Sequence, residues 1–375
     1  MPDTIVIGDA RSAPGKIARG TWEAFEHPTG LKEFLPVILA QGVEDGPCLV
    51  LSAGLHGPEH SGPMVLYRLL TDDLVGRLRG TIVALPALSP AGLRTMSREP
   101  YHDGQDPNRL WPDGRPARRP DLDVEPPTPL EAAFERLFAE VIPRASGWID
   151  FHNAWIGSIP FILRDRVLYR ETGDLETQRA EAQRLSDRLV QMSRAFGFTT
   201  VNEFPAEKYT SEKLHRSTSG AALLAGRIPA LTVELGSGPV PDVAIAAAAA
   251  AATRNVLRWA GMLSDPPESL TGIPVIDPGY AVRRRNAPRV PSACVALPRV
   301  EAGDTVTPQD PIADLFDIWG RPLDPPVLRC GYEGFVLGRR HGIYFYPGQS
   351  VTVLAIRDDL PLVAPYPKDF DNPDA

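Results

Sequence analysis

The sequence contains little cysteine, with three residues among 375. Cys48, Cys294 and Cys330 lie far apart, and no Cys-x-x-Cys pair occurs. This spacing excludes a disulfide-rich scaffold and a thiolate zinc knuckle. It is typical of proteins in a reducing compartment, so we expect a cytoplasmic location.

Long apolar runs are also missing. No stretch reaches the roughly 18 residues that a membrane-spanning helix needs, and the alanine-rich run 244–252 is short enough for the middle of a soluble helix. The N-terminal segment MPDTIVIGDARSAPGK lacks a basic stretch followed by a long apolar one. We therefore predict neither a signal peptide nor a membrane partner.

Excess positive charge is a third absence. The net charge is −8 and the isoelectric point is near 5.5, whereas nucleic-acid-binding proteins usually gather an excess of Lys and Arg on one face. The basic run Arg283-Arg284-Arg285 is short, and we interpret it as a solvated or ion-paired stretch. The sequence therefore predicts no nucleic-acid partner.

Apolar residues make up 43% of the chain, which is enough to form a large buried core. Apolar runs bounded by Gly and Pro alternate with segments of helical periodicity, which predicts an α/β fold with a mixed sheet flanked by helices. The predicted strands are 47–54, 79–86, 147–152, 159–163 and 228–235. The predicted helices are 61–75, 129–142, 174–197 and 241–263.

The character of the sequence changes after "SDPPESLTG" at 264–272. Short β-type runs separated by Gly and Pro then continue to about residue 358. We therefore predict one domain over 1–270, which contains the candidate site described below, and a small all-β C-terminal domain over 271–375. The short strands leave edges that need covering, so a homo-oligomer is possible. The Pro-rich segment 112–129 is predicted to be an exposed loop.

The turn "LSAGLHGPEHSG" at 51–62 is the first candidate site. His56 and Glu59 follow directly on a predicted strand, where the carboxyl-end loops of an α/β sheet form a crevice. At this spacing an imidazole nitrogen and a carboxylate oxygen can reach one zinc ion, and Gly57 lets the backbone bend without a Cβ clash. A lone His-x-x-Glu also arises by chance in a chain with seven histidines, so an ordinary polar loop is the alternative.

Catalytic zinc needs a third protein ligand. His152 in "WIDFHNAW" ends another apolar run and is our candidate, although a buried structural histidine would show the same pattern. Asp150 lies two residues earlier and would point the same way, as a carboxylate partner for His152. His60 is a competing ligand that we expect to mark a helix start instead.

Three further segments supply polar side chains. Glu234 ends the run in "PALTVELGSG" and could take a proton from a metal-bound water, or it could simply cap a helix or pair with a loop cation. Asn108 and Arg109 in "DGQDPNRLWP" have the groups that hold a carboxylate, with Arg98 ten residues earlier. An Asn-Arg pair is also common in surface loops.

Taken in order, "LHGPEHSG", "DPNRLWP", "WIDFH" and "LTVELGSG" resemble the succinylglutamate desuccinylase/aspartoacylase family of the zinc carboxypeptidase superfamily. The resemblance covers roughly residues 47–260, and the β-rich tail also resembles that family's C-terminal domain. It implies one zinc ion per chain, held by His56, Glu59 and His152. It implies Glu234 as general base and acid and Asn108 with Arg109 on the substrate's carboxylate. An upstream arginine would steady the oxyanion, which we assign to Arg98 rather than Arg94.

Two departures from the family pattern bear on the substrate. Leu88-Ser89-Pro90 stands where the family often has Asn-Pro. The long segment between His152 and Glu234 includes the charged helical stretch 174–197, which we interpret as an insertion near the site.

These features predict a zinc-dependent deacylase that hydrolyses a non-peptide amide bond in a small, carboxylate-bearing N-acyl amino acid or related N-acyl amine. Three alternatives stay open. They are a metallocarboxypeptidase acting on C-terminal peptide bonds, a deacylase of a non-amino-acid amide, and a zinc-dependent binding module without activity.

Overall fold

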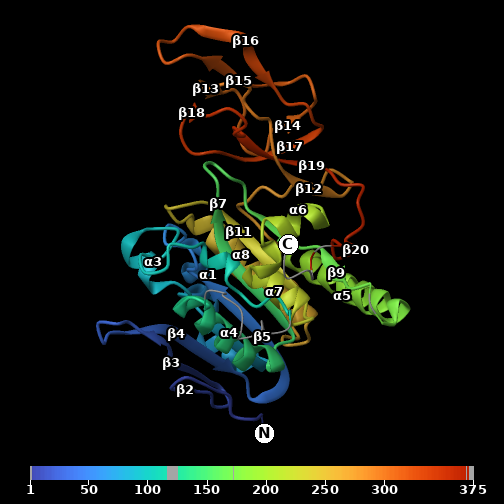
Figure 1. The fold of residues 1–375 in the computed structure, drawn as a ribbon. Helices are drawn as coiled ribbons and strands as arrows, with labels where there is room; N and C mark the ends of the chain where they lie inside the picture. The colour runs from blue at the N-terminus through green and yellow to red at the C-terminus, as the bar shows by residue number, and fades with distance from the viewer. Residues whose placement is uncertain (1, 116–125, 172, 369, 371–375) are drawn as a thin grey trace.

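The computed structural model of the chain describes residues 2–115, 126–171, 173–368 and 370. Strands and helices near the middle of the chain form a central body (Figure 1). The N-terminal strands lie at one end of this body and the C-terminal strands at the other. Among the described residues, no helix combines the length and apolar character that crossing a membrane requires.

The main sheet has twelve strands in the order β14-β17-β19-β12-β10-β8-β11-β7-β5-β6-β4-β3. Its strands are β3 (Lys16–Glu26), β4 (Lys32–Gln41), β5 (Glu44–Ala53), β6 (Arg79–Leu85), β7 (Gly147–Ala154), β8 (Phe161–Arg164), β10 (Thr199–Asn202), β11 (Ala230–Ser237), β12 (Val282–Asn286), β14 (Thr305–Val306), β17 (Gly334–Arg339) and β19 (Thr352–Arg357). A four-stranded sheet contains β16 (Pro322–Arg329), β15 (Pro311–Phe316), β13 (Cys294–Pro298) and β18 (Tyr344–Phe345). Two small pairs join β1 (Val6–Ile7) with β2 (Ala10–Arg11) and β9 (Val167–Tyr169) with β20 (Val363–Pro365).

Three adjacent strands of the sheet run parallel: β5, β7 and β11. In this register Ala53 pairs with Phe151 and Glu234 pairs with His152. The carboxyl ends of the three strands therefore meet at one edge of the sheet, where open α/β sheets place their ligands. Strands β7 and β11 are almost wholly buried, and so is β5 from Cys48 onward, as strands covered on both faces should be.

The helices are α1 (Ser61–Leu69), α2 (Asp72–Arg77), α3 (Pro90–Thr95), α4 (Pro129–Val141), α5 (Leu175–Phe196), α6 (Ala206–Ser211), α7 (Thr218–Leu224) and α8 (Val243–Trp259). Single 3₁₀ turns lie at Pro107–Arg109, Ile142–Arg144 and Leu214–Arg216. Side-chain caps begin the three longest helices: Thr128 for α4, Asp174 for α5 and Asp242 for α8. Each cap accepts a hydrogen bond from a free backbone N–H of the first turn.

Helices cover both faces of the sheet. Alternation along β7 directs Trp148, Asp150 and His152 to one face, because successive side chains point to opposite sides of a strand. On that face Trp148 contacts Phe138 of α4. The other face carries Phe151 and packs against α1, whose Gly62 lies so close that a Cβ would be 2.9 Å from the Phe151 Cβ. Helix α8 packs against α1 and α5.

The predicted α/β fold is confirmed, including its C-terminal region of antiparallel strands. Each strand predicted between 47 and 235 is present. The helices predicted over 129–142, 174–197 and 241–263 are present with shifted ends, whereas the single helix predicted over 61–75 is wrong, because Thr71 caps a new helix and divides the segment into α1 and α2. The N-terminal hairpin β3–β4 was not predicted, because β3 has many charged and exposed residues and lacks a clear apolar alternation. Part of the predicted loop 112–129, residues 116–125, lies outside the described residues.

The C-terminal region is joined to the main sheet. Strand β12 pairs with β10 through Asn202 and Arg283, and β19 and β17 extend the sheet beyond it. The predicted boundary near residue 270 stays a prediction.

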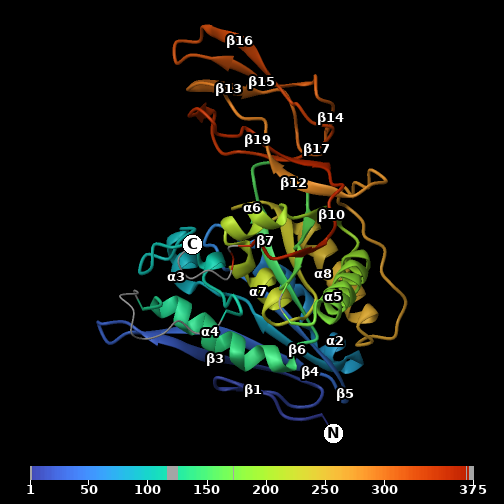
Figure 2. The same ribbon diagram turned by 45° about the vertical axis from the view of Figure 1, so that its right-hand side comes forward.

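The position expected for the 174–197 segment is wrong. Helix α5 packs against α8, on the face opposite α4, and Arg188 of α5 donates to the Ser146 carbonyl just before β7 begins. Figure 2 shows α4 and α5 on opposite sides of the strands. The helix is long and charged because one face is exposed to solvent, and it lies away from the carboxyl edge.

Candidate functional site

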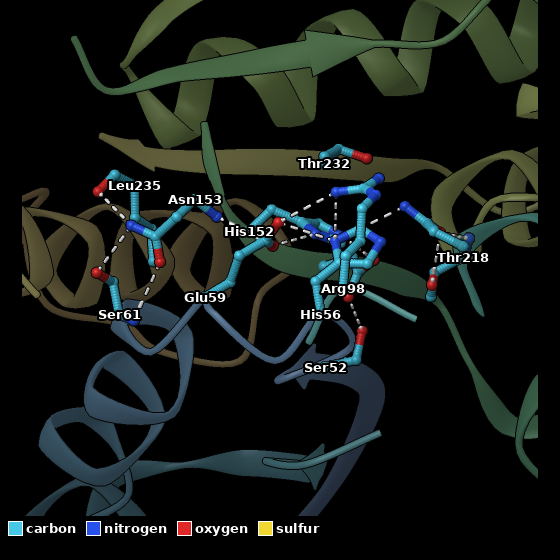
Figure 3. Close-up of polar contacts among 12 residues, drawn as sticks. Ser52, His56, Glu59, Ser61, Arg98, His152, Asn153, Thr218, Thr232 and Leu235 are labelled. Atoms are coloured by element: carbon cyan, nitrogen blue, oxygen red, sulfur yellow. Dashed lines mark hydrogen bonds and ion pairs between the residues drawn. The ribbon is translucent and has the colours of Figure 1, made fainter. Parts of the chain in front are cut away.

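Three predicted ligands come together at the carboxyl edge of the parallel strands. His56 follows β5, Glu59 closes the same turn, and His152 lies near the end of β7. All three side chains are buried, and one ligand atom from each lies within 4.8 Å of the others (Figure 3). His60, the competing candidate, is not in this cluster and directly precedes α1, as expected.

The Glu59 carboxylate lies between the two imidazoles. Its Oε1 is 2.8 Å from His56 Nδ1, and its Oε2 is 2.8 Å from His152 Nδ1. Both rings therefore direct the same type of nitrogen to one point. Two imidazole nitrogens and one carboxylate are a donor set that catalytic zinc sites use, so these residues fit the ion.

The outer nitrogen of each imidazole contacts another carboxylate. His56 Nε2 lies 2.9 Å from Asp106 Oδ1, and His152 Nε2 lies 2.7 Å from Asp150 Oδ2. Metal-binding histidines usually make such a contact, which fixes the tautomer and leaves the inner nitrogen free to bind the metal. The contact expected for Asp150 is present, and Asp150 is itself held by the Ser52 hydroxyl at 2.6 Å.

Close backbone packing shapes the turn that carries His56 and Glu59. A Cβ on Gly57 would lie 2.1 Å from the Gly92 carbonyl oxygen and 2.4 Å from that of Ser97. Glycine is therefore needed at position 57 because the backbone of the 92–97 segment packs directly against it. The bend of the turn, which the sequence suggested as the reason, is the less important one. The Gly57 N–H also donates to the Ser97 carbonyl at 3.0 Å, and Arg98 is the next residue in the chain.

Asn153 connects the turn to its neighbours. Its backbone N–H donates to Glu59 Oε2 at 3.2 Å, and its side chain donates to the Ser61 hydroxyl at 2.9 Å and to the Leu235 carbonyl at 3.1 Å. Through its backbone N–H and its side-chain amide, Asn153 thus connects the Glu59 carboxylate, the start of α1 and strand β11 (Figure 3).

Charges in the cluster shift one another's protonation. Burial alone would raise the pKa of Glu59, but the two imidazoles lower it well below its usual range. Burial alone would lower the pKa of His152, but Asp150 and Glu59 raise it well above its usual value. The cluster is thus a strongly coupled set of charges in a buried position, an arrangement common at functional sites.

Glu234 lies beside this cluster on β11. It is half-buried, and its Oε2 atom is buried without a hydrogen-bond partner. Burial raises the pKa of Glu234 to about 7, with His152 lowering it and Glu59 raising it. A carboxyl group with this pKa can both accept and donate a proton near neutral pH.

Arg98 and Arg94 lie in different environments. Arg98 Nη2 donates to Asp106 Oδ2 at 2.8 Å, and its Nη1 lies 3.6 Å from Glu59 Oε1. Arg94 instead pairs with Glu33, 3.1 Å away. Of the two arginines, Arg98 is therefore the one that contacts the cluster.

Asn108 contacts the site, and Arg109 follows it in the chain. Asn108 Nδ2 is 3.5 Å from His152 Nε2, and Asn108 Oδ1 accepts a hydrogen bond from the Thr218 N–H at 2.9 Å. The Arg109 guanidinium donates to the backbone carbonyls of Glu212, at 2.8 Å, and Asn108, at 2.6 Å. No carboxylate of the described residues forms an ion pair with Arg109, so its charge is available to an anion.

The sequence alone did not identify Asp106, Asn153 or Thr218 as parts of the site. Asp106 is the first residue of the segment "DPNRLWP", two positions before Asn108. The sequence therefore contained this carboxylate beside the predicted carboxylate-binding residues, but we interpreted it only as part of a loop. Its side chain also caps the 3₁₀ turn at Pro107–Arg109.

Comparison with known proteins identifies the family. Residues 45–260 match the sequence model of the succinylglutamate desuccinylase/aspartoacylase catalytic domain. The chain belongs to this family. The predicted family is therefore confirmed, and with it a hydrolase-type deacylase that acts on small molecules. No curated protein sequence matches the chain significantly.

Solved structures share the fold over nearly the whole chain. A succinylglutamate desuccinylase from a Silicibacter species is 18% identical with a TM-score of 0.68, covering 91% of this chain and 95% of that one. The product-bound ectoine utilization protein EutE (DoeB) from Ruegeria pomeroyi is 19% identical with a TM-score of 0.67, covering 91% and 94%. An aspartoacylase family protein from Mesorhizobium loti is 20% identical with a TM-score of 0.65, covering 96% and 99%.

Proposed function

We propose that the protein is a zinc-dependent deacylase. It hydrolyses the amide bond of a small N-acyl amino acid or related N-acyl amine, releasing a carboxylate and a free amine. The observation that carries this proposal is the buried cluster of His56, Glu59 and His152, with the partnerless carboxylate of Glu234 beside it. Family membership supports the reaction class.

In this proposal His56, Glu59 and His152 hold one zinc ion. When bound, zinc polarises the substrate's acyl carbonyl and makes water acidic enough to supply a nucleophile near neutral pH. Glu234 accepts the proton from the attacking water and later donates it to the leaving nitrogen. The raised pKa of Glu234 suits both steps, because it lies near the working pH.

Three polar side chains position the substrate. Arg98 stabilises negative charge on the acyl oxygen, and Asp106 orients its guanidinium through the 2.8 Å contact. Asn108 and Arg109 bind the substrate's carboxylate. Arg109 suits this role because its charge has no carboxylate partner among the described residues and its planar fork can make two parallel hydrogen bonds.

A substrate panel tests the proposal. Zinc-loaded protein is incubated with N-acetyl, N-succinyl and N-formyl amino acids and with short unblocked peptides, and the free amine released is measured. We expect hydrolysis of at least one acyl amino acid, with the peptides left intact. Cleavage of peptides alone would point to a carboxypeptidase, and zinc binding without any hydrolysis would point to a binding module.

A further inference from the structure

Three buried polar groups form a row behind the proposed zinc ligand His152, and the mechanism above gives no task to two of them. The groups are the carboxylate of Asp150, the hydroxyl of Ser52 and the indole of Trp148, and each side chain is fully buried. The parallel register of β5 and β7 sets Ser52 beside Asp150. Trp148 is two residues before Asp150 on the same face of β7. The pairing of the two strands therefore brings the three side chains together.

Hydrogen bonds join these groups in one direction. Trp148 Nε1 donates to Ser52 Oγ at 2.7 Å, and Ser52 Oγ donates to Asp150 Oδ1 at 2.6 Å. An indole N–H is only a donor, and a hydroxyl has a single proton. Because Ser52 accepts from Trp148, its own proton is directed to Asp150. The carboxylate of Asp150 therefore acts as an acceptor at this oxygen.

The other oxygen of Asp150 faces His152, with Oδ2 2.7 Å from Nε2. Asn108 Nδ2 also lies 3.5 Å from this nitrogen, but Asn108 Oδ1 accepts from the Thr218 N–H, so the amide presents a donor to the ring. Of these two neighbours, only Asp150 can accept a proton from Nε2. With zinc bound, His152 then carries its proton on Nε2. Its Nδ1, which lies 2.8 Å from Glu59 Oε2, is left to bind the metal.

We propose that Ser52 and Trp148 are positioning residues that hold the ring of His152, through Asp150, in the orientation that binds zinc. This inference rests on the proposed zinc site and adds two residues to the groups that support it. No lysine or arginine of the described residues forms an ion pair with Asp150, so the contacts with Ser52 and His152 orient its carboxylate. Since all of these groups are buried, the loss of one leaves its partner unsatisfied.

The experiment uses a matched pair of indole variants. Trp148→Phe removes the N–H that donates to Ser52, whereas Trp111→Phe removes an indole N–H that is buried without a hydrogen-bond partner. Both rings are fully buried and contact each other, with centroids 5.6 Å apart, so the two variants lose similar packing. We expect Trp148→Phe to raise the zinc dissociation constant by about 2- to 10-fold, the worth of one net hydrogen bond. Trp111→Phe should leave it unchanged. Competition with a chromophoric chelator measures both constants.

Ser52→Ala removes both hydrogen bonds of the hydroxyl and leaves Asp150 Oδ1 buried without its partner. We expect a larger rise in the zinc dissociation constant, about 10-fold or more, which is the low end for outer partners of a metal ligand. Ser186→Ala, at a buried position on α5, serves as control and should bind zinc like the wild-type protein.

A spectroscopic readout separates positioning from packing. In zinc-loaded protein with ¹⁵N-labelled histidine, the Nε2–H proton of His152 should resonate far downfield, because it is buried and donates to Asp150. Ser52→Ala and Trp148→Phe should shift this signal upfield. Trp111→Phe should leave it in place, because a loss of packing alone does not change the hydrogen bond to Asp150.

Two failures are distinguishable. If the wild-type protein binds zinc but Trp148→Phe and Trp111→Phe change its affinity equally, the positioning role is overturned and the zinc site stands. An unshifted His152 signal in Trp148→Phe overturns the role in the same way. If the wild-type protein binds no zinc, the proposed function itself fails. The pair of indole variants decides the matter even if Ser52→Ala does not fold.

Discussion

His56 Nε2 lies 2.9 Å from Asp106 Oδ1, although the two residues are 50 positions apart in the sequence. The opposite nitrogen of the same ring faces Glu59 at 2.8 Å. Asp106 therefore fixes which nitrogen of His56 faces the proposed metal position. Its charge also favours a cation there, and its own pKa lies well below the usual range, because His56 and Arg98 outweigh the effect of burial.

Replacing Asp106 should weaken metal binding without removing a ligand. We expect Asp106→Asn to lower zinc affinity by about 10- to 100-fold, since such outer partners orient the ligand and raise its basicity. Competition with a chromophoric chelator measures the dissociation constant. Asp45→Asn, at an exposed position, serves as control. Equal affinities for the two variants would show that the Asp106 contact has no part in metal binding.

Glu234→Gln should separate metal binding from turnover. The amide keeps the shape of the side chain but does not accept a proton, so we expect zinc content to stay near one ion per chain and kcat to fall by at least about 100-fold. Elemental analysis and steady-state kinetics on the same sample provide both values. Glu207→Gln, on the exposed side of α6, should behave like the wild-type protein. Turnover within a fewfold of wild type in the Glu234 variant would refute the assignment of the base.

Gly57→Ala tests the close approach of the 92–97 segment to the metal turn. The added Cβ would meet backbone oxygens at 2.1 and 2.4 Å, so the turn or the segment has to move. We expect a loss of stability of at least about 1 kcal/mol, in the range reported for overpacked positions, together with weaker zinc binding. Chemical denaturation of the metal-free protein measures the first effect.

The matched control for this variant is Gly76→Ala in α2, where an added Cβ meets nothing within 4 Å. That change should stabilise the protein by roughly 0.5–1 kcal/mol, because alanine has the higher helix propensity. Similar effects of the two substitutions would contradict the steric explanation.

The buried imidazole of His215 should make the free energy of unfolding depend on pH. It is buried against the Phe370 ring, and burial lowers its pKa to about 4. Its unfolded-state pKa is about 6.5, so its contribution to stability is fully present above pH 6.5 and is lost as the pH falls through 4. The full loss is on the order of 3 kcal/mol.

The measurement is the free energy of unfolding between pH 4 and 7.5 for His215→Gln and for the wild-type protein. The difference between the two should narrow at low pH, because the variant carries no titrating ring. His341→Gln, at an exposed position, should follow the wild-type curve. A constant difference between His215→Gln and wild type across this range would count against a buried neutral imidazole.

Much of the site could be predicted from sequence because its residues follow apolar runs. His56, His152 and Glu234 each end or follow a buried parallel strand, and parallel strands deliver such residues to one edge. Asp106 was missed because it lies in a Pro-containing loop whose path depends on contacts with distant segments.

The burial of Asp165 was missed for a related reason. Asp165 stands between two arginines in "FILRDRVLY", a pattern typical of an exposed turn. Its burial depends on Ser219 and Tyr209, which are distant in sequence. The pairing of β12 with β10 is likewise a long-range contact that local periodicity does not encode. The basic run Arg283-Arg284-Arg285 is half-buried, and Arg284 pairs with Glu203. Of the two predictions for this run, a solvated or an ion-paired stretch, the structure shows ion pairing.

The central claim is that one zinc ion binds between His56, Glu59 and His152. Anomalous diffraction at the zinc absorption edge, from crystals of the zinc-loaded protein, tests it most directly. We predict a single strong peak per chain, about 2.0–2.2 Å from Nδ1 of both histidines and from a Glu59 carboxylate oxygen. No peak at this position in a zinc-saturated crystal, or a peak only elsewhere on the molecule, would contradict the account.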